Sequence, residues 1–182
     1  MKVIETPLSE KTARSLKIGD IVYLSGSIVT GRDEMHIRAL ERNDKVTERI
    51  RNAVIFHCGP IVAEGSTGWE VVAAGPTTSA RMNSTAPEVI RRYGVRAVIG
   101  KGGMSEEVLD AMAEVGCVYL AATGGAAVSL AEGLTVEGVE WTDLGMAEAM
   151  WSLRAKRFGP LIVAMDSEGN SLYEDIKRSL RF

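Results

Sequence analysis

The chain has 182 residues and a mass of 19.6 kDa, a length typical of one domain with a substantial core. Hydrophobic residues make up 46% and charged residues 25% of it, which indicates a folded globular protein and excludes a mainly disordered one. Lys and Arg number 21 against 24 Asp and Glu, so the net charge of −3 gives no reason to expect a nucleic acid or an anionic membrane as partner.

Neither a membrane anchor nor a self-contained metal site is expected. Apolar runs such as residues 21–24 and 161–165 are far shorter than the roughly 20 residues that span a bilayer, and residues 1–5 lack a signal-peptide core. Cys58 and Cys117 stand alone, outside any CxxC motif, so both are expected to be core residues. We therefore expect a cytoplasmic protein with no metal ligands of its own.

In chain order, short apolar runs alternate with helical patterns. Runs of three to five apolar residues predict strands that are buried on both faces. They lie at residues 21–24, 53–56, 71–74, 97–99, 118–122 and 161–165.

The helical patterns have recognisable ends. Ser105 is a suitable N-cap, acidic residues follow it, and Gly116 can end the same helix, while Pro87 suits the first turn of another. Trp141 and Trp151 are expected to be core residues. Helices are predicted at residues 33–42, 87–93, 105–116 and 146–158, and residues 173–182 are expected to form an amphipathic terminal helix or a tail.

This alternation predicts an α/β fold in a single domain over residues 1–182, with a mixed central sheet and flanking helices. Residues 55–63 and 69–74 are expected to supply antiparallel pairing in that sheet. No internal repeat or linker is present.

Four glycine-containing loops follow strand-like runs and carry the candidate chemistry. Ligands of open α/β sheets lie beyond the carboxyl ends of strands, so these loops are expected to converge. Arg32, Arg81 and Lys101 would then form an anion site, and two guanidinium forks with one ammonium suit a small dicarboxylate. The loops are residues 30–33, 75–81, 100–103 and 123–125.

A phosphate ligand is the rival interpretation. The Walker pattern fails, because no glycine stands five residues before Gly100 and Gly102 replaces the Ser or Thr that would bind magnesium. The dinucleotide pattern has Ser105 in place of its third glycine and no suitable acidic residue near position 120. A nucleotide- or phosphometabolite-binding module therefore remains the alternative of another class.

Two histidines are candidates for polar roles. His36 follows Arg32 by four residues, so both can face one site if a helix begins at Asp33. A substrate-binding or general-acid role and a structural role are equally compatible with that position. His57, before Cys58, is expected to be structural.

These motifs together resemble the β subunit of class I fumarate hydratases and L-tartrate dehydratases, equivalent to the C-terminal domain of single-chain class I fumarases. The resemblance rests on TGRD-x-x-H-x-R at 30–38, HCGP at 57–60, AAGPTTS-x-RM at 73–82, GVRAVIGKGGM at 94–104 and FGP at 158–160.

The resemblance implies a swivelling β/α domain that closes over a 4Fe–4S cluster held by a separate α subunit. It also implies a hetero-oligomer, such as two α and two β subunits, in which the proton-abstracting base belongs to the α subunit. The reaction would be the reversible hydration of a small dicarboxylate, with fumarate/malate first and L-tartrate second. A lone structural or regulatory partner is a third possibility.

Residue by residue, the resemblance makes Arg32, Arg81 and Lys101 the substrate clamp, with His36 beside them. It makes Thr77 and Arg81 catalytic, with the Thr77 hydroxyl at the reacting atoms, and Thr78 is expected to cap the following turn. Two positions depart from the family pattern. Met35 stands where a small residue is usual and would narrow the mouth of the site, and Asn83 replaces an Asp near Arg81.

Overall fold

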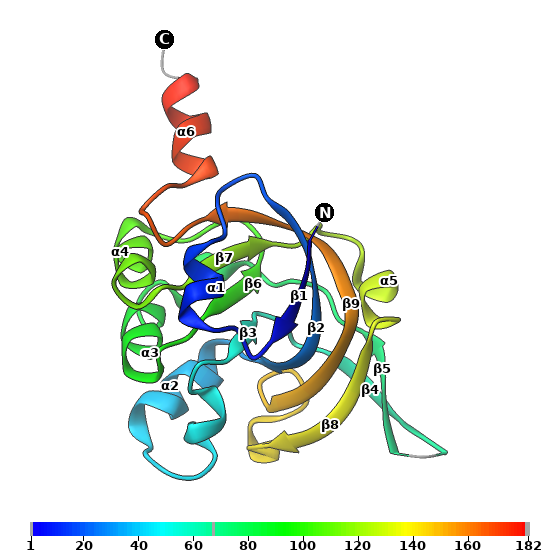
Figure 1. Ribbon diagram of the computed structural model, residues 1–182. Coiled ribbons are helices and arrows are strands. Elements are labelled where there is room, and N and C mark those ends of the chain that lie inside the picture. The colour runs from blue at the N-terminus through cyan, green and yellow to red at the C-terminus, as the bar shows by residue number, and fades with distance from the viewer. Residues whose placement is uncertain (1, 67, 181–182) are drawn as a thin grey trace.

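The computed structural model describes residues 2–66 and 68–180 and confirms the α/β class (Figure 1). The strands are β1 (Lys2–Thr6), β2 (Ile21–Thr30), β3 (Val54–Phe56), β4 (Ile61–Gly65), β5 (Gly68–Ala73), β6 (Ala97–Gly100), β7 (Val118–Ala121), β8 (Leu134–Glu140) and β9 (Met150–Met165). The helices are α1 (Glu10–Arg14), α2 (Asp33–Glu41), α3 (Ala86–Tyr93), α4 (Glu106–Val115), α5 (Ala127–Ala131) and α6 (Leu172–Ser179). Short 3-10 helices are η1 (Thr47–Ile50), η2 (Ser79–Met82) and η3 (Thr142–Leu144).

The central sheet closes on itself. Its order is β1-β2-β3-β6-β7-β9-β8, and the additional pairing of β2 with β9 joins β2, β3, β6, β7 and β9 into a ring. The pairs β1–β2, β2–β3, β3–β6 and β6–β7 are parallel, whereas β9 runs antiparallel to β2, β7 and β8. The sheet is therefore mixed, as predicted, and strongly curved along β2, β8 and β9 (Figure 1).

Side chains of the parallel strands alternate between two cores, which explains their continuous apolar sequences. In β3, Val54 and Phe56 belong to the core inside the ring, while Ile55 belongs to the core between the sheet and the helices. The same alternation occurs in β6 and β7. Helices α2, α3 and α4 cover the outer side, where α3 packs against both other helices (Figure 1).

One predicted helix is wrong. Residues 146–158 form a turn followed by the first part of β9, not a helix. Trp151, Leu153 and Ala155 are buried, whereas Arg154 and Lys156 are exposed, which is the two-residue period of a strand. The apolar spacing of three and four in this segment suggested a helix, but pairing with both β2 and β8 favours the strand.

Two further expectations are corrected or refined. Strands β4 and β5 are antiparallel, but they form a separate two-stranded hairpin outside the central sheet. The terminal segment is a helix, α6, and residues 181–182 of that prediction lie outside the described part of the chain. Trp141 and Trp151 are buried, as predicted. No helix in the described ranges is both long and apolar enough to cross a bilayer.

Candidate active site at the strand ends

The loops that carry the predicted site residues meet at one edge of the sheet. Backbone hydrogen bonds continue past the strand ends, with Gly31 N donating to Phe56 O at 2.9 Å and His57 N donating to Ile99 O at 2.8 Å. Ala122 N likewise donates to Gly100 O at 2.9 Å. The carboxyl ends of β2, β3, β6 and β7 are thereby held together, as parallel pairing requires.

At this edge the side chains of Arg81 and Arg32 each form an ion pair with an acidic residue. The Arg81 Nη2 atom lies 2.9 Å from Asp33 Oδ2, which joins η2 to the start of α2. The Arg32 Nε atom lies 3.3 Å from Glu148 Oε1, and Glu148 Oε2 accepts a hydrogen bond from Glu34 N at 3.1 Å. Glu148 therefore caps the N-terminus of α2 and also restrains the Arg32 side chain. Both contacts use the negative charge of the Glu148 carboxylate.

Lys101 is joined to the Thr77 loop through its backbone. Lys101 N donates to Thr77 O at 3.3 Å, and Lys101 O accepts from Ser79 N at 3.1 Å. Its side chain is exposed and forms no ion pair with any residue in the described ranges. Lys101 thus offers a free positive charge beside the loop that carries Thr77.

Thr77 and Thr78 occupy different environments. Thr77 is half-buried, and its N–H donates to His57 O at 2.7 Å. Thr78 is exposed and precedes η2, but its hydroxyl makes no capping hydrogen bond, so the predicted cap is wrong. The start of the short η2 helix is held instead by the backbone bond from Ser79 N to Lys101 O.

His36 and His57 are both buried behind these loops, with ring centroids 5.2 Å apart. Burial lowers the pKa of His36 to about 4, although the nearby Asp33 charge opposes the shift. Burial, and then the neighbouring His36, lowers the pKa of His57 well below its ordinary value. Both rings are therefore neutral near pH 7 and can act as hydrogen-bond donors or acceptors rather than as cations.

Buried polar atoms without hydrogen bonds concentrate here. Within the described residues such atoms include Arg32 Nε, Asp33 Oδ2, His36 Nε2 and His57 Nε2, with others at Trp141 and Ser167. For the arginine and the aspartate, the ion-pair distances are short but the geometry is not that of a hydrogen bond. The Nε2 atoms of His36 and His57 have neither a hydrogen bond nor an ion pair. Unpaired buried polar groups are costly, and two of them at one place are typical of a site that receives a polar ligand.

The two cysteines do not fit an iron–sulfur cluster on this chain. Cys58 and Cys117 are fully buried, and burial raises the pKa of Cys58 to about 12 and that of Cys117 still further from its ordinary value. A cluster ligand must be a thiolate, which such burial disfavours. Residues 2–66 and 68–180 also contain no group of three or more His, Cys, Asp or Glu that could hold a metal ion.

The two departures from the family pattern have structural explanations. Met35 is fully buried in the core beneath α2, so it does not line or narrow the mouth of the site. The Asn83 side-chain oxygen accepts a hydrogen bond from Ser105 N at 3.1 Å, at the start of α4. The carboxylate beside Arg81 is supplied by Asp33 instead.

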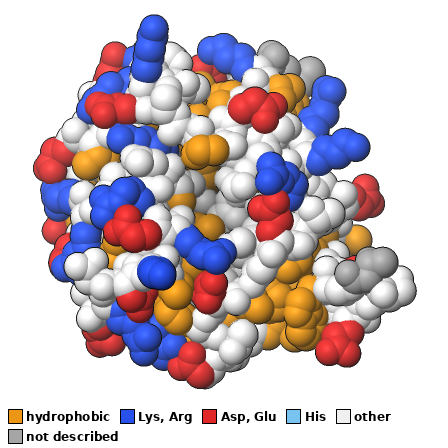
Figure 2. All heavy atoms as spheres, turned by 60° about the horizontal axis from the view of Figure 1, so that its bottom comes forward, with side chains coloured by type: hydrophobic (Ala, Val, Ile, Leu, Met, Phe, Trp, Pro, Cys, Tyr) orange, Lys and Arg blue, Asp and Glu red, His pale blue; other side chains and the backbone are white. Residues whose placement is uncertain are grey.

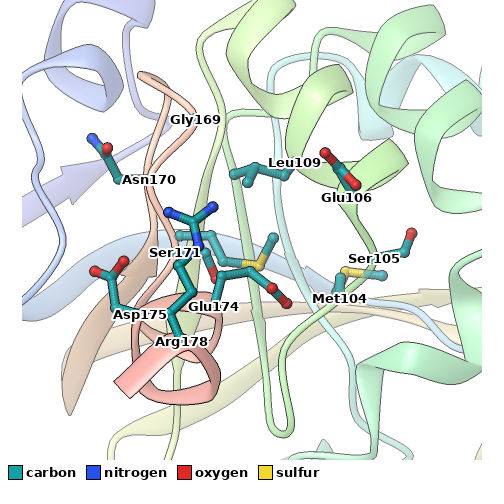
Figure 3. Close-up of a pocket in the computed structure, with 11 residues that line it drawn as sticks. Met104, Ser105, Glu106, Leu109, Gly169, Asn170, Ser171, Glu174, Asp175 and Arg178 are labelled. Carbon is teal, nitrogen blue, oxygen red and sulfur yellow. The ribbon is translucent and has the colours of Figure 1, made fainter. Parts of the chain in front are cut away.

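A cavity lies away from these loops, between the N-terminal end of α4 and helix α6 (Figure 3). It has a volume of about 270 Å³ and is lined by Ser105 and Glu106 from one side and by Glu174, Asp175 and Arg178 from the other. None of the predicted site residues lines it. Of those residues, Arg81 and Lys101 are exposed at the open edge where the strands end, Arg32 and Thr77 are half-buried, and His36 is buried behind them.

An apolar hollow adjoins this region. Trp69, Val139, Met146 and Trp151 are among the residues around a space of about 190 Å³, and Met146 precedes Glu148 by two positions. Figure 2 shows hydrophobic side chains gathered over part of the face that is at the bottom of Figure 1, between scattered charged groups. Two residues that line the hollow, Trp69 and Met146, are 43% and 46% exposed.

Sequence reasoning missed Asp33 and Glu148 as partners of the arginines. Asp33 was visible in the TGRD motif, but nothing local indicates that it contacts Arg81. Glu148 was assigned to a helix that does not exist. His57 was expected to be structural, and its hydrogen bond to Ser79 Oγ at 2.8 Å is compatible with that expectation.

Comparison with known proteins places almost the whole chain in one family. The Fumarase C-terminus family model matches residues 2–176. A provisionally named L(+)-tartrate dehydratase β subunit of Methanocaldococcus jannaschii is 46% identical over 178 residues, covering 95% of this chain and 91% of that protein. The L(+)-tartrate dehydratase β subunit of Escherichia coli K12 is 40% identical over 186 residues, covering 97% and 89%.

A longer relative shows the same segment joined to other sequence. A provisionally named class I fumarate hydratase of Geobacillus stearothermophilus is 45% identical over 178 residues, which cover 97% of this chain but 34% of that protein. The match of the family model to residues 2–176, with relatives 40% and 46% identical over nearly the whole chain, shows that this chain belongs to the Fumarase C-terminus family.

Proposed function

We propose that this chain is the β subunit of an iron–sulfur hydro-lyase that adds water to, or removes it from, a small hydroxy-dicarboxylate. The observation that supports the proposal is that Arg32, Arg81 and Lys101 lie on loops that are joined to one another, by the Arg81–Asp33 ion pair and by the backbone bond of Ser79 to Lys101. A dianion is the ligand that such a set of cations suits best. The relatives named above support fumarate/malate and L-tartrate as the substrates to test.

The residues of this chain would bind and orient the substrate. Arg32 and Arg81 present guanidinium groups for its carboxylates, and Asp33 and Glu148 hold those groups before substrate arrives. Lys101 adds a charge that no acidic side chain in the described ranges neutralises. As a proton leaves the carbon next to a carboxylate, negative charge develops on that carboxylate, and these fixed cations stabilise it.

Thr77 is proposed to place its hydroxyl at the reacting atoms, from the loop that His57 and Lys101 hold through the backbone. The 4Fe–4S cluster is assigned to the α subunit, where it would supply a Lewis acid for the departing hydroxide. This division is supported by the buried cysteines of the present chain. The partner would complete the open edge, and the apolar hollow beside Glu148 is a surface available to it.

Anaerobic reconstitution tests the proposal. The isolated chain should be colourless and inactive, and it should gain hydro-lyase activity on fumarate or L-tartrate only with a cluster-bearing subunit. A stoichiometric cluster on this chain alone, or turnover without a partner, would contradict the proposed division. A nucleotide-induced thermal shift of the isolated chain would favour the nucleotide-binding alternative.

A further inference from the structure

A buried chain of three side chains lies beneath the Thr77 loop and connects three strand ends. The Tyr119 hydroxyl, on β7, donates to Ser79 Oγ at 2.9 Å. Ser79 Oγ in turn lies 2.8 Å from His57 Nδ1, at the end of β3. All three residues are fully buried, at 0% exposure. None of them belongs to the proposed substrate-binding set.

The backbone around these side chains connects them to the proposed site residues. His57 O accepts from Thr77 N at 2.7 Å, so His57 contacts the loop through both its carbonyl and its ring. Ser79 N donates to Lys101 O at 3.1 Å, and Lys101 N donates to Thr77 O at 3.3 Å. Ser79 is therefore bonded through its backbone to Lys101 and, by way of Lys101, to Thr77.

One arrangement of the protons in this chain lets each hydroxyl group donate to the next member. Burial raises the pKa of Tyr119 above its ordinary range, so the phenol keeps its proton and donates it to Ser79. Ser79 can then donate its own proton to His57 Nδ1, which places the histidine proton on Nε2. Because burial also keeps the pKa of His57 low, the ring stays neutral and this arrangement persists near pH 7.

Gly100 leaves the space that the network needs. A Cβ atom at this position would lie 1.9 Å from Ser79 Oγ and 2.9 Å from the Tyr119 hydroxyl. Any larger residue at the end of β6 would displace the two hydroxyl groups. The strand end and the network therefore fit each other sterically as well as through hydrogen bonds.

We propose that Tyr119, Ser79 and His57 are positioning residues that fix the Thr77 hydroxyl and the Lys101 ammonium for the reaction. This inference rests on the proposed function, because it takes Thr77 and Lys101 as the groups that meet the substrate. The His57 ring acts through Nδ1, as an acceptor from Ser79. Its role is therefore distinct from that of a histidine that would touch the substrate through Nε2.

Two substitutions of His57 separate these roles. His57→Asn keeps an acceptor near the place of Nδ1, whereas His57→Gln keeps a polar group near the place of Nε2 and loses the acceptor. In the reconstituted two-subunit enzyme, we expect kcat/KM to fall at least tenfold further in His57→Gln than in His57→Asn, because small displacements of reacting groups cost about tenfold to a hundredfold in rate. Equal losses, or a larger loss in His57→Asn, would overturn the proposal.

Substitutions of two tyrosines, Tyr119 and Tyr93, separate the loss of the network from the loss of any buried hydroxyl group. Tyr119→Phe should lower kcat about tenfold or more. Tyr93→Phe removes a similarly buried hydroxyl, which donates to Ala39 O at 2.5 Å, and should lower the melting temperature without a comparable loss of kcat. Equal effects of the two variants on kcat, at matched folded fractions, would show a merely structural role.

Hydrogen–deuterium exchange on the isolated chain distinguishes failure of this inference from failure of the proposed function. His57→Gln and Tyr119→Phe should speed exchange at the amides of Thr77, Ser79 and Lys101, whereas Tyr93→Phe should not. If the wild-type complex shows no hydro-lyase activity, the proposed function is overturned and exchange alone tests the network. Unchanged exchange in both network variants would overturn the network itself.

Discussion

The Arg81 guanidinium lies 2.9 Å from the Asp33 carboxylate and joins two loops that are remote in the sequence. The Arg81 side chain is 52% exposed and that of Asp33 28%, so the pair contributes at most about 1 kcal/mol to stability. Its importance is geometric, because it places Arg81 next to the residue that follows Arg32. A substrate carboxylate that binds both arginines would meet them already oriented.

Removing Arg81 or Lys101, two of the three cations of the proposed clamp, should impair catalysis without unfolding the chain. In the reconstituted complex, Arg81→Ala and Lys101→Met should each lose on the order of 2 to 4 kcal/mol of transition-state stabilisation, measured as kcat/KM. The control is Arg154→Ala, because Arg154 is exposed on β9 and pairs with Glu137. An unchanged kcat/KM for Lys101→Met, or similar losses in all three variants, would contradict the clamp.

The neighbouring threonines should differ in kinetics. Thr77→Val keeps the side-chain shape but removes the hydroxyl, so we expect kcat to fall far more than KM rises. Thr78→Val should change both activity and melting temperature little, because the Thr78 side chain is exposed and makes no cap. Measurements of kcat, KM and melting temperature for both variants test this. A kinetic defect in Thr78→Val instead would show that Thr78 is the residue at the reacting atoms.

Stability should fall as pH drops through the range in which His36 titrates. The folded-state pKa of about 4 is below the ordinary value of 6.5, so between these values the unfolded chain binds more protons. The stability contributed by neutral, buried His36 is present above pH 6.5 and is lost toward pH 4. Between pH 7 and pH 5 this loss should be about 2 kcal/mol.

The comparison uses free energies of unfolding by denaturant at pH 7 and pH 5 for wild type and His36→Asn. The free energy of unfolding should change less with pH in the variant, since the variant lacks the titrating His36 ring. His57 should lower the stability of both proteins as the pH falls, because its pKa is also lowered in the folded state. An equal pH dependence in the two proteins would show that His36 does not titrate differently on unfolding.

Gly59 should be needed for the position of Arg32. A Cβ atom at Gly59 would lie 2.8 Å from Arg32 Nη1 and 3.0 Å from Ala147 O, so Gly59→Ala must displace one of them. We expect KM to rise about tenfold, which corresponds to about 1.4 kcal/mol of binding free energy. Gly138→Ala is the matched control, because a Cβ there meets nothing within 4 Å. An unchanged KM for Gly59→Ala would show that Arg32 can move without loss of binding.

The sequence by itself determined the local features of this protein. The buried strands β3, β6 and β7 were predictable because the side chains on both of their faces are apolar. Helix α4 was predictable from its acidic first turn and from Gly116 at its end. The loops with Arg32, Arg81 and Lys101 were identifiable from glycine and charge alone. Each of these signals resides in a few adjacent residues, where backbone preference and burial act directly.

The tertiary structure decided what depends on contacts between distant segments. In the segment that begins β9, the spacing of the apolar residues is compatible with a helix or with a strand. Pairing with β2 and β8 makes it a strand. The contacts of Arg81 with Asp33, of Arg32 with Glu148 and of His57 with Ser79 have no local signature. They form because the closed sheet brings the strand ends to one edge, where long-range hydrogen bonds and ion pairs, rather than local preference, set the positions of the side chains.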